Sequence, residues 1–289
     1  MNRILIGVFL LFLSYSKITA QENSLFWEIS KKKYKTSYLY GTIHSTDSRV
    51  FSFGESVLPS LFKCKAYAGE LIMQPEDIYA IVPYLFERDA AKQCKNILSK
   101  EEYFNLESLV EAKLGKEILL ILPKTSPYIA SLLLISPNDY SENPATIFLD
   151  IFFQEKADSL GKKLIGLETV KSQMAYIQNI EINAQKAHLL RVMKEDSSRE
   201  DFEEIIAIYL AEDLKKIQEL TLLASDEDPL ITDDFIIGRN YIHKDGIIAA
   251  MKEQSTFIAI GAAHLPGEEG VIALLENAGF TLKAIPNHP

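Results

Sequence analysis

Two apolar runs that end with the same residue spacing decide the fold of this chain. They are YLYGTIHS (Tyr38–Ser45) and FIAIGAAHLPG (Phe257–Gly267), and both have the composition expected of buried strands. Each ends in Gly-x-x-His, which places His44 and His264, 220 positions apart, just beyond a strand. Glycine lets the backbone turn sharply or another group come close. We therefore expect each histidine on a loop at the edge of a sheet, where open α/β sheets carry their binding sites.

Further strands are expected near both ends of the chain. They are LFWEIS (25–30), AYAGELIM (66–73), KKLIGLE (162–168) and FTLKAI (280–285). The lysine-rich segment SKKKYK (Ser30–Lys35) joins the first two strands and has the character of a solvated hairpin loop. Neither end of the chain can complete a sheet alone, so the two ends are expected to meet in one mixed sheet.

The middle of the chain has helical periodicity, with apolar residues every three or four positions. Ser99 with Glu102 forms a capping box, and Gly115 and Gly161 stand where C-terminal caps belong. The expected helices are 76–90, 99–115, 144–161, 169–223 with a break at 196–199, 232–253 and 267–279. The predicted fold class is α+β (mixed α/β). A central mixed sheet built from the N- and C-terminal strands is covered by a large helical middle section, all in one domain over residues 21–289.

Composition limits the classes of function. The 289 residues are 47% hydrophobic, which is enough for a substantial core. A net charge of −10 argues against nucleic acid as a partner, because proteins that bind it carry a basic surface. After the N-terminal segment, no run approaches the roughly 20 apolar residues that span a bilayer. We therefore expect a peptide or small-molecule substrate and no membrane span in the mature chain.

Residues 1–20 have the pattern of a secretory signal peptide. MNR provides positive charge, ILIGVFLLFLSY is apolar, and SKITA ends in a small residue, which predicts cleavage after Ala20 and a periplasmic or secreted protein. A retained membrane anchor is the alternative. In an oxidising compartment Cys64 and Cys94 can form a disulfide, which closes a loop of about thirty residues worth ~3 kcal/mol, or they can stay reduced.

Two glutamates stand at the ends of predicted strands. Glu70 lies near the end of 66–73 and Glu168 closes 162–168. A buried carboxylate costs several kcal/mol unless it is paired or bound to a cation. Together with His44 and His264, these glutamates make a minimal ligand set for Zn²⁺, Mn²⁺ or Co²⁺. Arg239 can hold a carboxylate or stabilise an oxyanion, or it can form a purely structural ion pair with a buried glutamate.

The other histidines are expected to have no role in the site. His188 lies in a mixed polar helix and is expected to face solvent, His243 is expected at the surface near a helix end, and His288 is in the terminal tail. The chain has no Gly-x-Ser-x-Gly, P-loop, His-Glu-x-x-His or Gly-x-Gly-x-x-Gly motif. Serine hydrolases, kinases and zincins are therefore poorly supported.

An ordered set of motifs resembles the TraB/GumN family, which is related to the Tiki metalloproteases and to PrgY. The motifs are WEIS with YLYGTIHSTDS, AGEL, GLET with Gln173, GRN (238–240) and GAAHLPGEEGVIALLENAGF (261–280). The resemblance implies a paired-strand core and two Gly-x-x-His units that converge on one site. For the Tiki branch it implies divalent-metal-dependent proteolysis, with His44, Glu70 and His264 at the matching positions. Asp150 matches an aspartate of many members, although the residues before it depart from the usual glycine-bearing version.

Three hypotheses follow for the function. The first is an exported metal-dependent hydrolase, most simply a peptidase, in which His44, Glu70 and His264 bind Mn, Co or Zn. In this hypothesis Glu70 is a ligand or the general base, Glu168 supports the site and Arg239 orients the substrate. The second is a metal-free hydrolase of an ester or lactone with a histidine as the base. The third is a protein that binds a peptide, a signal molecule or haem in the same cleft without turnover.

Overall fold

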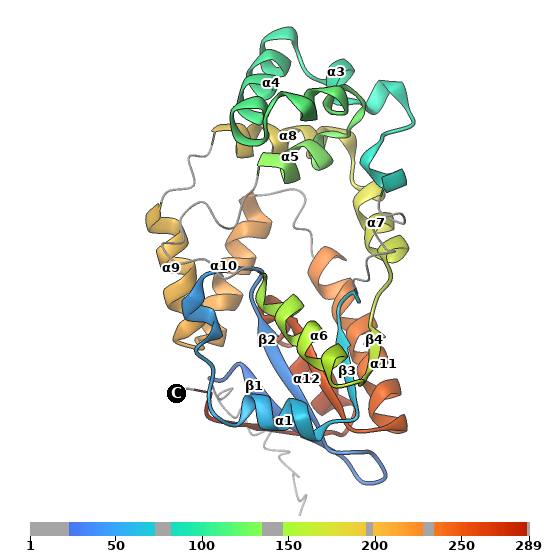
Figure 1. The fold of residues 1–289 in the computed structure, drawn as a ribbon, viewed down its shortest axis with the longest axis vertical. Helices are drawn as coiled ribbons and strands as arrows, with labels where there is room; N and C mark the ends of the chain where they lie inside the picture. Colours follow the sequence, from blue (N-terminus) through green and yellow to red (C-terminus); the bar gives the residue numbers. More distant parts are fainter. Residues whose placement is uncertain (1–22, 73–81, 135–146, 195–198, 228–233, 288–289) are drawn as a thin grey trace, which may run out of the picture.

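A computed structural model describes residues 23–72, 82–134, 147–194, 199–227 and 234–287 (Figure 1). The expected signal peptide, residues 1–20, and His288 lie outside these ranges. Within them, no helix is long and apolar enough to cross a bilayer.

A single six-stranded sheet organises the molecule. Its strands stand in the order β4-β3-β5-β2-β1-β6. Strand β1 pairs antiparallel with β2 and β6, whereas β2, β5, β3 and β4 run parallel to one another. The bounds are β1 Phe26–Ser30, β2 Ser37–Thr42, β3 Ala66–Gly69, β4 Lys163–Gly166, β5 Thr256–Gly261 and β6 Thr281–Ala284. The predicted mixed sheet, built from both ends of the chain, is confirmed.

The two Gly-x-x-His turns follow neighbouring strands. Strands β2 and β5 pair in parallel register, with Thr42 opposite Gly261. Because β3 and β4 run in the same direction beside them, the carboxyl ends of all four strands meet at one edge of the sheet. Residues from four separate parts of the sequence are thereby collected in one place.

Glycine at position 41 is required by the packing of one turn on the other. A Cβ atom at Gly41 would lie 2.6 Å from Cδ1 of Leu265 and 3.3 Å from Cα of Ala262. The segment after β5 therefore packs directly against the backbone of β2, at a distance that a side chain would prevent.

Helices cover both faces of the sheet. Figure 1 shows α6 (Leu149–Ser159) in front of it and α12 (Val271–Asn277) behind it. Phe153 of α6 packs against Tyr40 and Phe257 of the strands, with ring centroids 5.1 and 5.4 Å away. Two further helices adjoin this core, α1 (Val57–Lys63) and α11 (Arg239–Glu253).

Part of the helical middle forms a lobe beyond one edge of the sheet, drawn at the top of Figure 1. Its helices are α3 Cys94–Ile97, α4 Lys100–Leu114, α5 Pro127–Leu134 and α8 Ile182–Lys194. They enclose a second apolar cluster that includes Leu106, Val110 and Leu189. The predicted capping box is confirmed, because Ser99 accepts the Glu102 amide at 3.2 Å and Glu102 accepts the Ser99 amide at 2.7 Å.

The long helical stretch predicted for 169–223 is interrupted more often than the sequence indicated. It comprises α7 (Val170–Asn179), α8, α9 (Arg199–Leu210) and α10 (Leu214–Glu227). The break between α9 and α10 has a clear cause. Glu212 adopts a positive φ of 54°, and its carboxylate accepts the amide of Leu25 at 2.7 Å. A tertiary bond to the start of the first strand therefore ends the helix.

Two further predictions can be compared with the structure: the helix at 76–90 and the possible disulfide between Cys64 and Cys94. In the described part of the predicted helix 76–90, only residues 82–85 are helical, and a short 3-10 turn follows at Ala90–Lys92. The two cysteines are buried and do not form a disulfide. Cys64 belongs to the core of the sheet and Cys94 to the cluster of the lobe.

Replacing Gly41 tests the close packing of the two turns. We expect Gly41→Ala to lower the free energy of unfolding by about 1–3 kcal/mol, because the added methyl group overpacks the contact with Leu265. Gly238→Ala is the matched control, since its Cβ would meet nothing closer than 3.9 Å. Urea denaturation at neutral pH measures both variants. A Gly41→Ala protein as stable as the control would contradict the packing.

Candidate active site

The carboxyl ends of the parallel strands carry all four of the predicted acidic and histidine site residues. Glu70 directly follows β3, and Glu168 lies two residues beyond β4. His44 lies two residues beyond β2, and His264 closes the 3-10 turn that follows β5. Arg239, the first residue of α11, reaches the same edge from the helix.

The Glu70 carboxylate is held at both oxygens. Oε1 accepts the amide of Gly261 at 2.7 Å, and Oε2 lies 2.5 Å from Nη2 of Arg239. A Cβ on Gly261 would lie 3.2 Å from Oε1, so a glycine there leaves room for the carboxylate. Burial alone would raise the pKa of Glu70, but the positive charge of Arg239 and the amide of Gly261, both present while the His264 ring is neutral, hold it below its ordinary value. The group is therefore ionised throughout the neutral range.

Arg239 bridges two carboxylates in the interior. Its Nε donates to Oε1 of Glu168 at 2.8 Å, and its Nη2 donates to Glu70. The Arg239 side chain is only 8% exposed and that of Glu168 is fully buried. Burial opposes the charge of Arg239, but the two carboxylates outweigh it and raise its pKa. Burial likewise opposes ionisation of Glu168, and the bonds to His243 and Arg239 lower its pKa. The structural ion pair that the sequence left open is thus present.

His243 belongs to this network, so its predicted surface position is wrong. It is fully buried, and its Nε2 lies 2.7 Å from Oε1 of Glu168. The reason is the register of α11, which begins at Arg239. His243 is therefore one turn beyond the arginine, on the same face of the helix, which is turned toward the buried carboxylate of Glu168.

His188 is also buried, which contradicts its predicted exposure. Helix α8, which carries it, packs against α5, and the ring of Tyr128 lies 6.3 Å from that of His188. The sequence does not predict a helix at Pro127–Leu134, which is the element that covers this histidine.

Asn240 fixes the protonation pattern of His264. Nδ2 of Asn240 donates to the backbone carbonyl of Glu269 at 2.8 Å, so its Oδ1 must face His264, whose Nδ1 lies 2.6 Å away. An amide oxygen only accepts, hence Nδ1 carries the proton and Nε2 keeps a lone pair. Burial lowers the pKa of His264 to about 3, so the ring stays neutral. Nε2 lies 3.8 Å from Oε1 of Glu70.

His44 is held in a similar way but stands in the open. Its Nδ1 lies 3.4 Å from Oδ1 of Asp150, in the first turn of α6, and its ring stacks on Phe148 with centroids 4.1 Å apart. The side chain is 67% exposed. The interaction with Asp150 raises the pKa of His44. Asp150, whose role the sequence left in doubt, is thus the partner of the first histidine.

A cavity of about 680 Å³ joins these groups. His44, Asp150, Glu70 and Arg239 contribute to its wall, together with the apolar or aromatic residues Tyr67, Leu71, Phe148 and Ile151. This volume is within the range of small-molecule sites. His264 is not among the described residues that line the cavity. Its Nε2 lies 3.8 Å from Oε1 of Glu70, which does line it.

The chemistry of the donors fits a divalent cation at Glu70 and His264. An ionised carboxylate faces an imidazole lone pair, and the far ring nitrogen is bonded to an oxygen, as is usual for metal-binding histidines. Two ligands of one tetrahedral ion, each about 2.1 Å from the metal, lie about 3.4 Å apart. The observed 3.8 Å between Oε1 and Nε2 is close to that separation.

The full predicted trio requires a movement. In the described part of the chain, the one group with three ligand atoms mutually within 4.8 Å is Glu70, Glu168 and His243. The guanidinium of Arg239 already bonds both of its carboxylates, so this group is a charge-paired network. His44, Glu70 and His264 do not form such a group, so binding all three to one ion requires at least one to shift.

One comparison with known proteins covers nearly the whole of the described fold. The model of the TraB/PrgY/gumN family matches residues 25–284, which include every residue of the site. Searches of curated proteins and of solved structures gave no significant match.

Removing the buried guanidinium should be strongly destabilising. We expect Arg239→Met to cost about 3–5 kcal/mol of unfolding free energy, because two carboxylates lose their shared cation. Arg49→Met is the control, since Arg49 also bonds two acids, Asp47 and Glu203, but is 43% exposed. Its loss should cost about 1 kcal/mol or less. Equal costs in urea denaturation would contradict the central place of Arg239.

The tautomer of His264 can be measured directly. In the wild type, ¹⁵N NMR of the imidazole rings should show a protonated Nδ1 and an unprotonated Nε2 for His264. Asn240→Leu removes the acceptor, so the proton should redistribute toward Nε2, while Asn240→Asp keeps an acceptor and should keep Nδ1 protonated. A wild-type His264 with its proton on Nε2 would rule out the arrangement.

Proposed function

The chain belongs to the TraB/PrgY/gumN family, and from that premise we propose that it is a divalent-metal-dependent hydrolase, most simply a peptidase. One observation carries the proposal: the ionised Glu70 lines a cavity that His44 also lines, and the neutral His264, with a lone pair on Nε2, lies 3.8 Å behind its carboxylate. This is the donor chemistry that Mn²⁺, Co²⁺ and Zn²⁺ accept.

Glu70, His264 and His44 would hold the ion. When bound, a divalent ion supplies Lewis acidity and favours the deprotonation of water at neutral pH. The low pKa of Glu70 makes its carboxylate a weak proton acceptor, because an efficient base has a pKa near the working pH. We therefore assign Glu70 the role of ligand in preference to that of general base.

Arg239 and Glu168 support these groups from within the protein. Arg239 fixes the orientation of Glu70 through Oε2, and Glu168 neutralises Arg239 from the other side. Both are positioning residues. The substrate would enter along the cavity wall formed by Phe148, Tyr67 and Ile151, which suits an apolar side chain next to the scissile bond.

A metal-free hydrolase of an ester or lactone is the second candidate, and two observations favour it. Both oxygens of Glu70 already accept hydrogen bonds, and Asp150 raises the pKa of the exposed His44. In this reaction Nε2 of His44 takes a proton from water as the water oxygen bonds to the carbonyl carbon. The proton then passes to the leaving oxygen as its bond to that carbon breaks.

We also propose that the protein is exported. The support is the apolar segment of residues 1–20 with its small residue at Ala20, a pattern typical of signal peptides.

Metal content and peptide cleavage test the proposal. After growth or incubation with manganese, cobalt and zinc, we expect about one ion per chain and cleavage of unstructured peptides that a chelator abolishes. His44→Ala and Glu70→Gln should each lose at least ten-fold in metal affinity and in cleavage rate, with the circular dichroism spectrum unchanged. Glu155→Gln, an exposed change on α6, is the control and should behave as wild type.

Other results of the same experiment would support the alternative functions. Wild-type protein that remains metal-free yet hydrolyses an ester, and loses this on His44→Ala, supports the second candidate. Protein that binds peptides in the cavity without cleaving any bond is a binding protein, and both hydrolase proposals are then wrong.

A further inference from the structure

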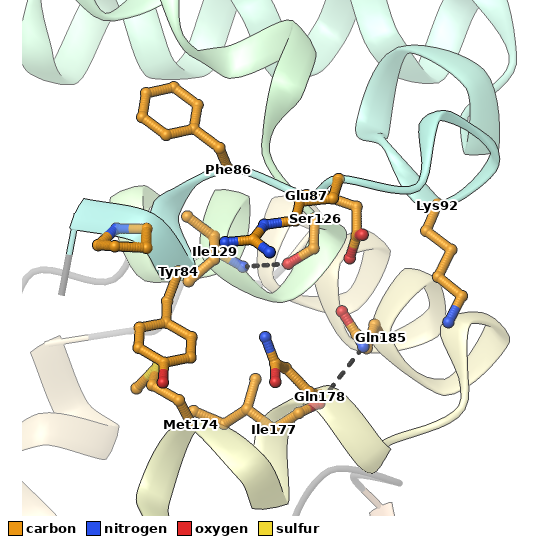
Figure 2. Close-up of a pocket in the computed structure, with 12 residues that line it drawn as sticks. Tyr84, Phe86, Glu87, Lys92, Ser126, Ile129, Met174, Ile177, Gln178 and Gln185 are labelled. Carbon is orange, nitrogen blue, oxygen red and sulfur yellow. Dashed lines mark hydrogen bonds between the residues drawn. The ribbon is translucent and has the colours of Figure 1, made fainter. Parts of the chain in front are cut away.

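A second hollow, of about 430 Å³, lies in the helical lobe. It is bounded by residues 83–92, the beginning of α5, and helices α7 and α8 (Figure 2). It shares no lining residue with the cavity at the strand ends. Its volume is within the range of about 300–1,000 Å³ that small-molecule sites have.

One side of this hollow is apolar. Ile129 of α5 and Ile177 of α7 are buried at its floor, and Met174 and Tyr84 are half-buried beside them. In Figure 2, Met174 and Ile177 lie along α7 below the hollow, with Tyr84 at one end. Such a wall removes hydrocarbon from water and so favours a ligand with an apolar body.

The charges at the rim favour an anion. Arg88 and Lys92 both line the hollow, and neither has an ion pair with any residue that the structure describes. Glu87 also lines the hollow, but its carboxylate accepts the amide of Asp89 at 2.8 Å, and the nearby Asp89 accepts the amide of Ala91 at 3.0 Å. In a chain with a net charge of −10, two bases of one short segment are thus left for an external anion.

The polar groups of the floor are of two kinds. Gln185 is structural, since it donates to the carbonyl of Ile180 at 3.1 Å and accepts the amide of Tyr128 at 3.4 Å, joining α8 to α5. Ser126 accepts the amide of Ile129 at 3.3 Å through its hydroxyl oxygen, which leaves the hydroxyl proton for a ligand. A rigid floor that offers the hydroxyl of Ser126 as a donor suits a ligand that accepts hydrogen bonds.

We propose that this hollow is a second binding site, for an organic carboxylate with an apolar body. The carboxylate pairs with Arg88 and Lys92, and the apolar part lies against Tyr84, Met174 and Ile177. A medium-chain fatty acid and an apolar peptide with a free C-terminus share this chemistry. The site is independent of the reaction assigned to the strand ends.

Calorimetric titration with matched acid and amide pairs tests the site. The probes are octanoate and octanamide, and an N-acetylated leucine dipeptide with a free carboxyl group and its C-terminal amide. We expect at least one acid to bind with a stoichiometry of one, at least ten-fold more tightly than its amide. The double variant Arg88→Gln/Lys92→Gln should weaken that acid at least ten-fold. Lys95→Gln/Lys100→Gln, which removes the same charge from exposed positions of the lobe, should not.

Each result identifies or rejects the ligand class. Preference for octanoate assigns a lipid-derived carboxylate, and preference for the dipeptide acid assigns a peptide C-terminus. The proposal is overturned if neither acid binds, if acids and amides bind equally, if several copies bind, or if both double variants weaken binding alike.

Discussion

The buried guanidinium of Arg239 is the interaction on which the rest of the site depends. Two carboxylates at the ends of neighbouring strands, Glu70 and Glu168, could not be buried side by side without a cation between them. Arg239 supplies it from the first turn of α11 and so ties that helix to the sheet. The same helix brings Asn240 and, one turn later, His243 to the site. These two ion pairs thus determine the position of the helix, the ionisation of Glu70 and the surroundings of His264.

The repeated Gly-x-x-His unit gives two histidines of different character. Both are held at Nδ1 by an oxygen of a side chain, Asn240 for His264 and Asp150 for His44. His264 is buried, neutral and fixed, whereas His44 is exposed and stacked on Phe148. The fixed His264 beside the Glu70 carboxylate gives the proposed metal ion two ligands that are already in place. The accessible His44 on the cavity wall can then complete the ligand set when an ion binds.

Much of the fold was predictable because it rests on local patterns. The apolar strands, the glutamates at their ends and the capping box at Ser99 follow from residue type and spacing alone, and the structure confirms these elements. The meeting of the chain's two ends was predictable because neither could complete a sheet. The ion pair of Arg239 with Glu168 was foreseen only as one of two alternatives, since spacing does not reveal which side chain is buried.

What the sequence did not reveal depends on tertiary contacts. His243 looked like a surface residue because the start of α11 could not be located to within one turn, and one turn decides which face a residue occupies. His188 is buried by α5, a helix that the residue pattern does not predict. The break at Glu212 results from a bond to Leu25, nearly two hundred positions away. In each case the sequence does not reveal the residue or helix that makes the tertiary contact, although the local secondary-structure preference can be read from it.

The most direct test of the account is an anomalous diffraction measurement on crystals soaked with Mn²⁺. The account predicts one strong peak about 2.0–2.3 Å from Oε1 of Glu70 and Nε2 of His264, with His44 turned toward it and Arg239 still bonded to Glu70 and Glu168. A peak among Glu70, Glu168 and His243 with Arg239 displaced, or no peak at the strand ends at all, would contradict it.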